Sequence, residues 1–137
     1  MGADDPVGPF DISANDLLLG LLRTADGVGA LPAFDVVVIE QVRSYGMAVG
    51  AEVFDTVHWS GRFHEAALPL PVVLLPRQAV KLALCHDSRA KDANIRAALI
   101  DRYGGPAAIR KGGALFGVHG DVWAALAVAV TYADSVA

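Results

Sequence analysis

Cysteine is almost absent from this chain, which contains only Cys85 among 137 residues. An internal disulfide requires two cysteines, and a cysteine-based zinc cluster requires still more, so the sequence excludes both. A single thiol is typical of a protein that works in a reducing compartment. We therefore expect a cytoplasmic protein.

Long hydrophobic runs are also missing, although hydrophobic residues make up 54% of the chain. Pro69, Pro71 and Pro76 interrupt the apolar stretches before they reach the ~18 to 20 residues that a membrane-spanning helix needs. The segment 1–9 is acidic and contains glycine and proline, unlike a signal or transit peptide. We expect no membrane partner and one domain with a single core.

The net charge of −4 conceals an uneven distribution of charge. Residues 77–111 contain eight of the eleven basic residues and only three acids, which gives +5, whereas the remainder carries −9. A basic segment on an acidic body suits a polyanion that approaches from one side. The alternative is that two solvated helices happen to be basic.

The segment 35–41 predicts a buried strand that ends in a carboxylate. Its four consecutive β-branched residues, Val36 to Ile39, show no polar alternation, as in a central strand covered on both faces. Glu40 follows where the strand leaves the core, and ligands gather at the carboxyl ends of strands in open α/β sheets. Alternatively, Glu40 is simply the first solvated residue after a strand.

Other segments alternate between helix and strand patterns. A capping box at Ser13 opens a leucine-rich helix, and Ser88 is expected to cap a helix that runs to Tyr103 with Ile95, Leu99 and Tyr103 on its inner face. The remaining expected elements are a helix over 47–67, a buried strand over 72–75, a short helix or turn over 77–84, a flexible basic loop over 110–113, and a helix over 121–134 that is buried all round. This pattern predicts an α/β layer structure.

Two acids are anchored to the elements that we expect to be buried, Glu40 at the strand end and Asp121 at the start of the last helix. We expect them to meet across a sheet edge, where they would repel each other unless they shared a divalent cation. Hard oxygen ligands favour Mg²⁺ or Mn²⁺. That arrangement is the chemistry of metal-assisted phosphodiester hydrolysis, with no small-molecule cofactor.

From Asp35 onward the chain resembles the RuvC-type Holliday junction resolvases of the ribonuclease H-like superfamily, including their phage relatives. The matching stretches are Ile39-Glu40-Gln41, the segment 77–81, the segment 88–92, and the end from Trp123 to Thr131. The resemblance implies a ribonuclease H-like three-layer α/β fold formed by a single domain over 1–137. It also implies a metal-dependent endonuclease that resolves four-way DNA junctions as a homodimer.

Carried over by position, Glu40 would be the second catalytic carboxylate and Asp121 an acid of the C-terminal pair. Lys81 and Lys91 match two lysines that the family places near the scissile phosphate and the junction backbone, where a mobile point charge is useful. The alternative is that both lysines are ordinary surface residues.

The resemblance and the charge distribution also suggest residues that bind DNA. Arg43 and Tyr45 follow the strand of Glu40, in the loop from which the family inserts a side chain into the junction. Tyr45 would stack on an unpaired base, an interaction of about 1 to 3 kcal/mol, or pack against its own domain. Further contacts are expected from basic residues of the segment 77–111, namely Arg77, Arg89, Arg110 and Lys111.

The chain departs from the family pattern at two places. Nothing corresponds to the family's first strand with its catalytic Asp, or to the hairpin strand after it, so we expect an N-terminally truncated domain that is weak or inactive as an enzyme. Ala124 stands where a second C-terminal acid is expected, and His119 is a substitute metal ligand or a solvated side chain. The competing function is a non-catalytic module that binds branched DNA or shapes it.

Overall fold

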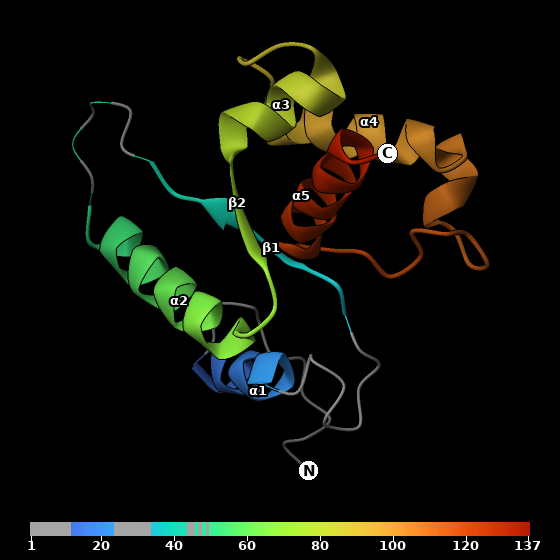
Figure 1. Cartoon of the computed structure of the whole chain (residues 1–137). Coiled ribbons are helices and arrows are strands. Elements are labelled where there is room, and N and C mark those ends of the chain that lie inside the picture. The colour runs from blue at the N-terminus through green and yellow to red at the C-terminus, as the bar shows by residue number, and fades with distance from the viewer. Residues whose placement is uncertain (1–11, 24–33, 44–45, 47, 49) are drawn as a thin grey trace. The chain divides into compact units, whose positions relative to one another are not determined.

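The computed structural model describes residues 12–23, 34–43, 46, 48 and 50–137, and the chain is a mixed α/β protein, as expected. It divides into two compact units, Met1–Val73 and Leu74–Ala137. The strands β1 (Val37–Gln41) and β2 (Val72–Pro76) form a two-stranded parallel sheet, and β2 spans the boundary between the units (Figure 1). Within the described ranges, every helix is too short or too polar to cross a membrane.

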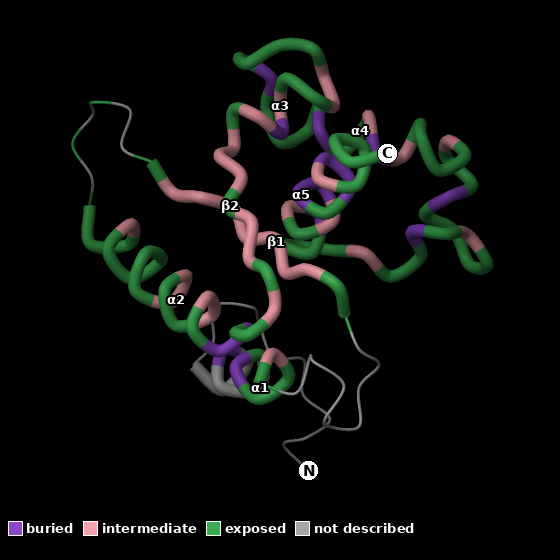
Figure 2. The backbone as a smooth tube through the Cα atoms, viewed as in Figure 1, coloured by how far each residue is buried: buried purple, intermediate pink, exposed green. Residues whose placement is uncertain are grey.

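The N-terminal unit is built around two helices, α1 (Ile12–Arg23) and α2 (Ala51–Ala67), which pack against each other. Leu19, Ala66 and Ala67 are buried where the C-terminal end of α2 meets α1 (Figure 2). The predicted leucine-rich helix is confirmed, and α1 begins at Ile12, so Ser13 is part of the helix.

The strand β1 differs from the prediction of a central strand covered on both faces. All five of its residues are half-buried, because β2 is the one strand that pairs with it in the described chain. The N–H group of Val37 donates a hydrogen bond of 3.0 Å to the Pro71 carbonyl, which fixes the register at the start of the pair. Glu40, which was expected to follow the strand, is part of it, because β1 continues to Gln41.

The segment between α2 and β2 was predicted correctly from its prolines. The helix α2 ends at Ala67, and Pro69 and Pro71 separate it from β2, since proline cannot donate a helical hydrogen bond. The start of α2 was predicted too early, because the helix begins at Ala51 after an extended Gly50.

The C-terminal unit contains α3 (Arg77–Cys85), α4 (Asp92–Arg102), the 3-10 helix η2 (Gly105–Ile109) and α5 (Val122–Ser135). The helix α3 packs against both α4 and α5, and α4 also contacts η2. Leu99, which is 0% exposed, lies in the resulting core. Its other buried apolar residues are Val80, Ala90, Ile95, Ala108, Leu115, Trp123, Ala127, Val128 and Val130 (Figure 2).

The predicted cap of α4 at Ser88 is wrong, because the preceding segment folds into a turn of its own. The Asp87 carboxylate accepts the N–H of Arg89 at 2.8 Å, and the Asp87 carbonyl accepts the N–H of Ala90 at 3.1 Å. The helix begins after Lys91, whose N–H donates to the Asn94 side chain at 2.9 Å. Local side-chain hydrogen bonds of this kind compete with helix formation and decide where it starts.

The inner face of α4 was predicted correctly for Ile95 and Leu99, which are buried, but wrongly for Tyr103. Tyr103 is 38% exposed because α4 ends at Arg102, and Gly104 then adopts a φ of +117°, which redirects the chain. The position therefore no longer follows the helical periodicity that placed it in the core.

The helix α5 follows Asp121 as predicted, but it is not buried all round. Trp123, Ala127 and Val130 face the core, whereas Ala125 and Ala129 are exposed. The apolar pattern overstated burial because alanine is small and is tolerated on a solvated helix face as well as in the core.

Candidate nucleic-acid interface

The division into units is also a division of charge. Residues 74–137 contain eight basic residues and five acids, which gives +3, whereas residues 1–73 contain three basic residues and ten acids, which gives −7. The two values sum to the total of −4. The basic segment found in the sequence therefore belongs to one compact unit, all of which the structure describes.

Some cations of the C-terminal unit hold its helices together. The Arg102 guanidinium at the end of α4 donates two hydrogen bonds, of 2.6 and 2.7 Å, to the Asp134 carboxylate on α5. This hydrogen-bonded pairing lowers the pKa of Asp134 and raises the pKa of Arg102. The Arg96 guanidinium lies 5.0 Å from the centre of the Trp123 ring, a cation–π contact between the same two helices.

Two of the residues expected to bind DNA are paired with acids. Arg77 at the start of α3 forms an ion pair with Asp92 at the start of α4. Arg89 is exposed in the turn before α4, with its Nε atom 3.4 Å from the Asp87 carboxylate. Both arginines still lie at the surface or near it, but part of their charge is neutralised locally.

Four other cations of this unit form no ion pair within the part of the chain that the structure describes. Lys81 is half-buried on α3, Lys91 is exposed at the start of α4, and Arg110 and Lys111 are exposed in the loop after η2. Because no carboxylate of the described residues neutralises them, their charge remains available to an external anion.

Arg110 and Lys111 border a hollow of about 430 Å³. Its other lining residues are Tyr103, Gly104, Ala107, Ala108, Gly112, Gly113 and Ala114. The hollow therefore combines two cations with a partly exposed aromatic ring and a glycine-rich backbone. An aromatic face and a cation side by side are the groups that hold the base and the phosphate of an unpaired nucleotide.

The shape of this hollow depends on a tight turn, in contrast to the flexible loop predicted from its glycines. The N–H of Gly113 donates to the Arg110 carbonyl at 2.8 Å, and the N–H of Leu115 donates to the Ala108 carbonyl at 2.9 Å. A Cβ atom on Gly113 would lie 2.2 Å from the Ala108 carbonyl oxygen. Only glycine allows the backbone to approach this closely.

Sequence reasoning missed Tyr103 as a surface residue. The signal was present in Gly104-Gly105-Pro106, which follows it directly and ends the helix. A residue at the C-cap of a helix often escapes the face that periodicity assigns to it.

The two carboxylates expected to share a cation belong to different units. Glu40 is half-buried on β1, whereas Asp121 is exposed at the N-cap of α5 and makes no side-chain capping hydrogen bond. Their convergence on one metal ion stays a prediction. In the described ranges, no group of three His, Cys, Asp or Glu side chains is placed to hold a metal ion.

His119 lies in the loop that leads to Asp121, separated from it by Gly120. Its Nδ1 atom lies 2.8 Å from the Gly117 carbonyl oxygen. Because a carbonyl only accepts, Nδ1 is the donor of this bond, and in a neutral imidazole Nε2 then has the lone pair that a metal ion needs. His119 is exposed, so a ligand can reach it.

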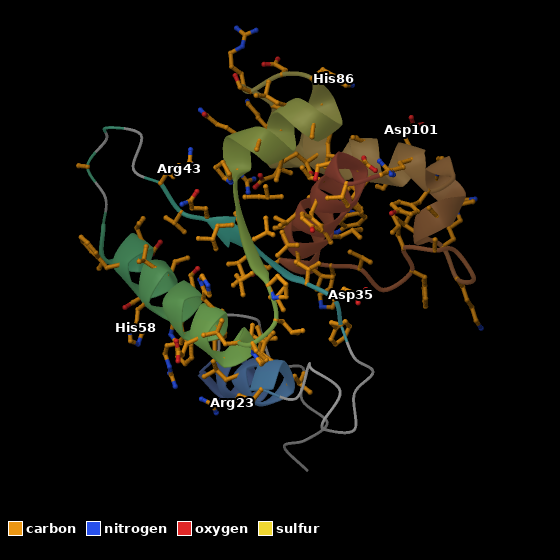
Figure 3. The ribbon with its side chains drawn as sticks, in the orientation of Figure 1. Arg23, Asp35, Arg43, His58, His86 and Asp101 are labelled. Atoms are coloured by element: carbon orange, nitrogen blue, oxygen red, sulfur yellow. The ribbon has the colours of Figure 1, made fainter. Side chains whose placement is uncertain are left out.

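Of the two residues expected to enter a junction, the structure describes one. Arg43 is exposed just beyond β1, and its Nε group donates a 3.0 Å hydrogen bond to the Gln41 side chain (Figure 3). Tyr45 lies outside the described residues.

Comparison with known proteins gives no further assignment. No protein-family model and no curated protein matches this chain.

Proposed function

We propose that this chain binds nucleic acid through the basic surface of its C-terminal unit, and that its ligand is a branched, four-way DNA junction. The observation that supports this best is the presence of four cations, Lys81, Lys91, Arg110 and Lys111, that have no acid partner among the described residues, in a unit of net charge +3. Cations that are not neutralised internally release counterions from DNA when they contact its phosphates.

The hollow beside η2 supports contact with unpaired nucleotides. Arg110 and Lys111 would bind phosphate, while the exposed ring of Tyr103 offers a stacking surface, worth about 1 to 3 kcal/mol per base in single-strand binders. Bases at the centre of a four-way junction are easier to unstack than bases in continuous duplex. Arg77, Arg89 and Arg43 would bind the DNA backbone as well.

We further propose the reaction that the resemblance to RuvC-type resolvases implies, metal-dependent cleavage within a ribonuclease H-like fold. Glu40 and Asp121 would hold Mg²⁺ or Mn²⁺, ions that favour carboxylate oxygens, with Nε2 of His119 as a further ligand. A bound ion would polarise the phosphodiester, and Lys81 and Lys91 would stabilise charge on its oxygens. Two symmetric cuts would require a homodimer, acting in the cytoplasm.

Cleavage is tested with a labelled four-way junction in the presence of Mg²⁺ or Mn²⁺. The protein should introduce symmetric nicks at a low rate, as the weak activity expected from the sequence implies, and Glu40→Gln and Asp121→Asn should each abolish them while junction binding persists. Asp101→Asn is the matched control, because Asp101 is an exposed acid on α4 outside the proposed site (Figure 3). It should leave the nicks unchanged.

The second candidate function is a non-catalytic module that binds branched DNA, and the alanine at position 124 favours it. The same assay separates the two. Tight junction binding by the unmodified protein without nicks under either metal would support the module, whereas no preference for a junction over duplex would contradict both functions.

A further inference from the structure

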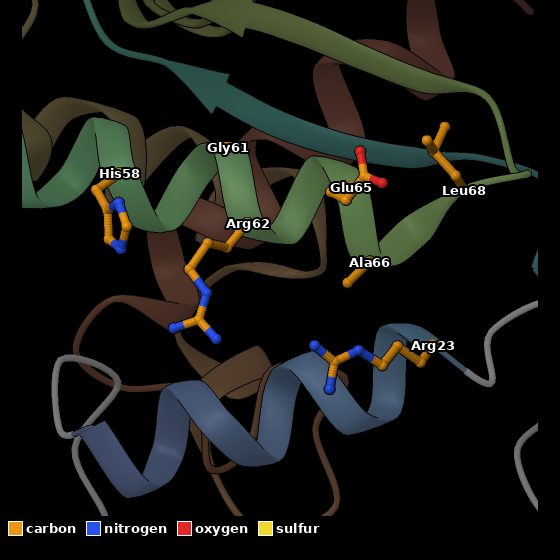
Figure 4. Close-up of a pocket in the computed structure, with 7 residues that line it drawn as sticks. All are labelled: Arg23, His58, Gly61, Arg62, Glu65, Ala66 and Leu68. Atoms are coloured by element: carbon orange, nitrogen blue, oxygen red, sulfur yellow. The ribbon is translucent and has the colours of Figure 1, made fainter.

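A second hollow, of about 620 Å³, lies between α1 and α2 in the N-terminal unit. Its lining residues are Arg23, His58, Gly61, Arg62, Glu65, Ala66 and Leu68 (Figure 4). A volume of this size lies within the range of small-molecule sites, about 300 to 1,000 Å³. It is independent of the basic surface described above, which belongs to the other unit.

The polar side chains that point into this hollow are cationic or basic. Arg62 and His58 on α2 and Arg23 at the end of α1 point into the space between the helices, whereas the Glu65 carboxylate points away from it (Figure 4). The unit carries only three basic residues against ten acids, and two of the three meet here. Counting the described residues alone, the hollow is thus a local positive region in an acidic unit.

Neither arginine is neutralised by an acid within the described ranges. The Arg62 guanidinium lies 4.5 Å from the centre of the Trp59 ring, a contact that orients it without removing its charge. Arg23 is exposed at the last residue of α1. Two guanidinium groups that face one hollow repel each other, and an anion between them converts that repulsion into attraction.

We infer that this hollow binds a phosphate-type dianion, the phosphoryl group of a small phosphorylated molecule. Guanidinium groups match the oxygens of phosphate in bidentate geometry, and two of them balance a charge of −2. The imidazole of His58 supplies a further polar contact, and the hollow leaves room for more than the phosphoryl group itself. A phosphate of a nucleic-acid backbone has the same chemistry, so the experiment must separate the two sources.

The full chain, labelled with ¹⁵N, is titrated with inorganic phosphate and with pyrophosphate while the two tryptophan indole N–H signals are followed by NMR. The signal of Trp59, which contacts Arg62, should shift and saturate. The signal of Trp123 lies in the other unit and should not move. Chloride at equal ionic strength should leave both signals in place.

Substitutions then assign the effect to the hollow. Arg23→Gln and Arg62→Gln should each weaken phosphate binding about tenfold, and together they should abolish it. Glu52→Gln, which changes an exposed acid in the first turn of α2 outside the lining of the hollow, should leave the affinity unchanged. Circular dichroism establishes that each variant retains its helices.

Two results would overturn the inference: a Trp59 signal that phosphate and pyrophosphate leave unmoved, or an affinity that survives in a folded double variant. Binding of a single-stranded oligonucleotide identifies the source of the phosphate. DNA binding should be unchanged in the double variant if the ligand is a free phosphorylated molecule. If the double variant loses both phosphate binding and DNA binding, the hollow is still a phosphate site, but its ligand is the backbone of a nucleic acid.

Discussion

The two units of this chain contrast in both charge and burial. The C-terminal unit has a net charge of +3 and buries apolar residues from every one of its helices, whereas the N-terminal unit carries −7 and, among its described residues, buries Leu19, Ala66 and Ala67. The boundary between the acidic and the basic part of the chain is therefore also the boundary between the unit with few described buried residues and the unit with many. The larger described core and the proposed DNA surface therefore belong to the same unit.

The largest effect should come from the core of the C-terminal unit. Leu99→Ala removes a side chain that is 0% exposed and should lower the free energy of unfolding by about 2 to 5 kcal/mol, because less apolar surface is buried and a cavity is left behind. Native-state hydrogen exchange should show weaker protection in α4 and α5. Leu19→Ala, the matched change in the N-terminal unit, should leave that protection unchanged. Equal effects of both variants would mean that the units unfold as one.

The next effect concerns charge. Replacing Lys81, Lys91, Arg110 and Lys111 together with glutamine should reduce junction affinity by about 100-fold at low salt, and should reduce the salt slope by about 0.9 for each DNA phosphate that the protein no longer neutralises. Mobility shifts at several salt concentrations measure both quantities. The control removes two basic residues of the N-terminal unit, Arg23 and Arg62. If that variant binds the junction as weakly, the DNA surface does not belong to the C-terminal unit.

A smaller effect tests the turn that shapes the hollow beside η2. Gly113→Ala would force a methyl group against the Ala107 and Ala108 carbonyl oxygens, at 2.4 and 2.2 Å, and should destabilise the protein by about 1 to 3 kcal/mol. Gly20→Ala in α1 meets no atom within 4 Å and should instead stabilise it by about 0.5 to 1 kcal/mol. Thermal unfolding measures both changes. Destabilisation by both, or by neither, would contradict the close approach at Gly113.

The smallest effect should come from the exposed pair between α4 and α5. Because Arg102 lowers the pKa of Asp134, this carboxylate stabilises the folded state above its unfolded pKa of about 3.9. The contribution disappears as the pH falls through the lower, folded pKa. Asp134→Asn should therefore be slightly less stable than the parent at neutral pH and equal to it in strong acid, with a smaller difference at high salt. A difference that persists in acid would assign the effect to packing.

Helices and strands were predictable from the sequence wherever a local signal was strong. The prolines at 69 and 71 end α2 and precede β2, and the spacing of Ile95 and Leu99 identifies the buried face of α4. Predictions failed where neighbouring groups decided the outcome. The turn made by Asp87 and the capping bond from Asn94 moved the start of α4 from Ser88 to Lys91.

The candidate site was predictable only in part. The clustering of basic residues in the sequence located the proposed DNA surface, because charge is a property of residue type and the cluster coincides with one unit. It did not distinguish Arg77 and Arg102, which pair with acids, from Arg110 and Lys111, which do not in the described chain. Which acid an arginine pairs with depends on which side chains the packing brings close together. The spacing of residues along the sequence does not give their distance in space.

The sequence by itself determined the α/β class, the partition of charge and the ends of several elements, because these depend on residue type and on neighbours along the chain. Tertiary structure decided which cations pair with acids, that Tyr103 reaches the surface, and that Arg23 and Arg62 face one hollow. The physical reason is distance. Electrostatic and packing energies act over a few ångströms in space, and residues far apart in the sequence come within that range only when the chain folds.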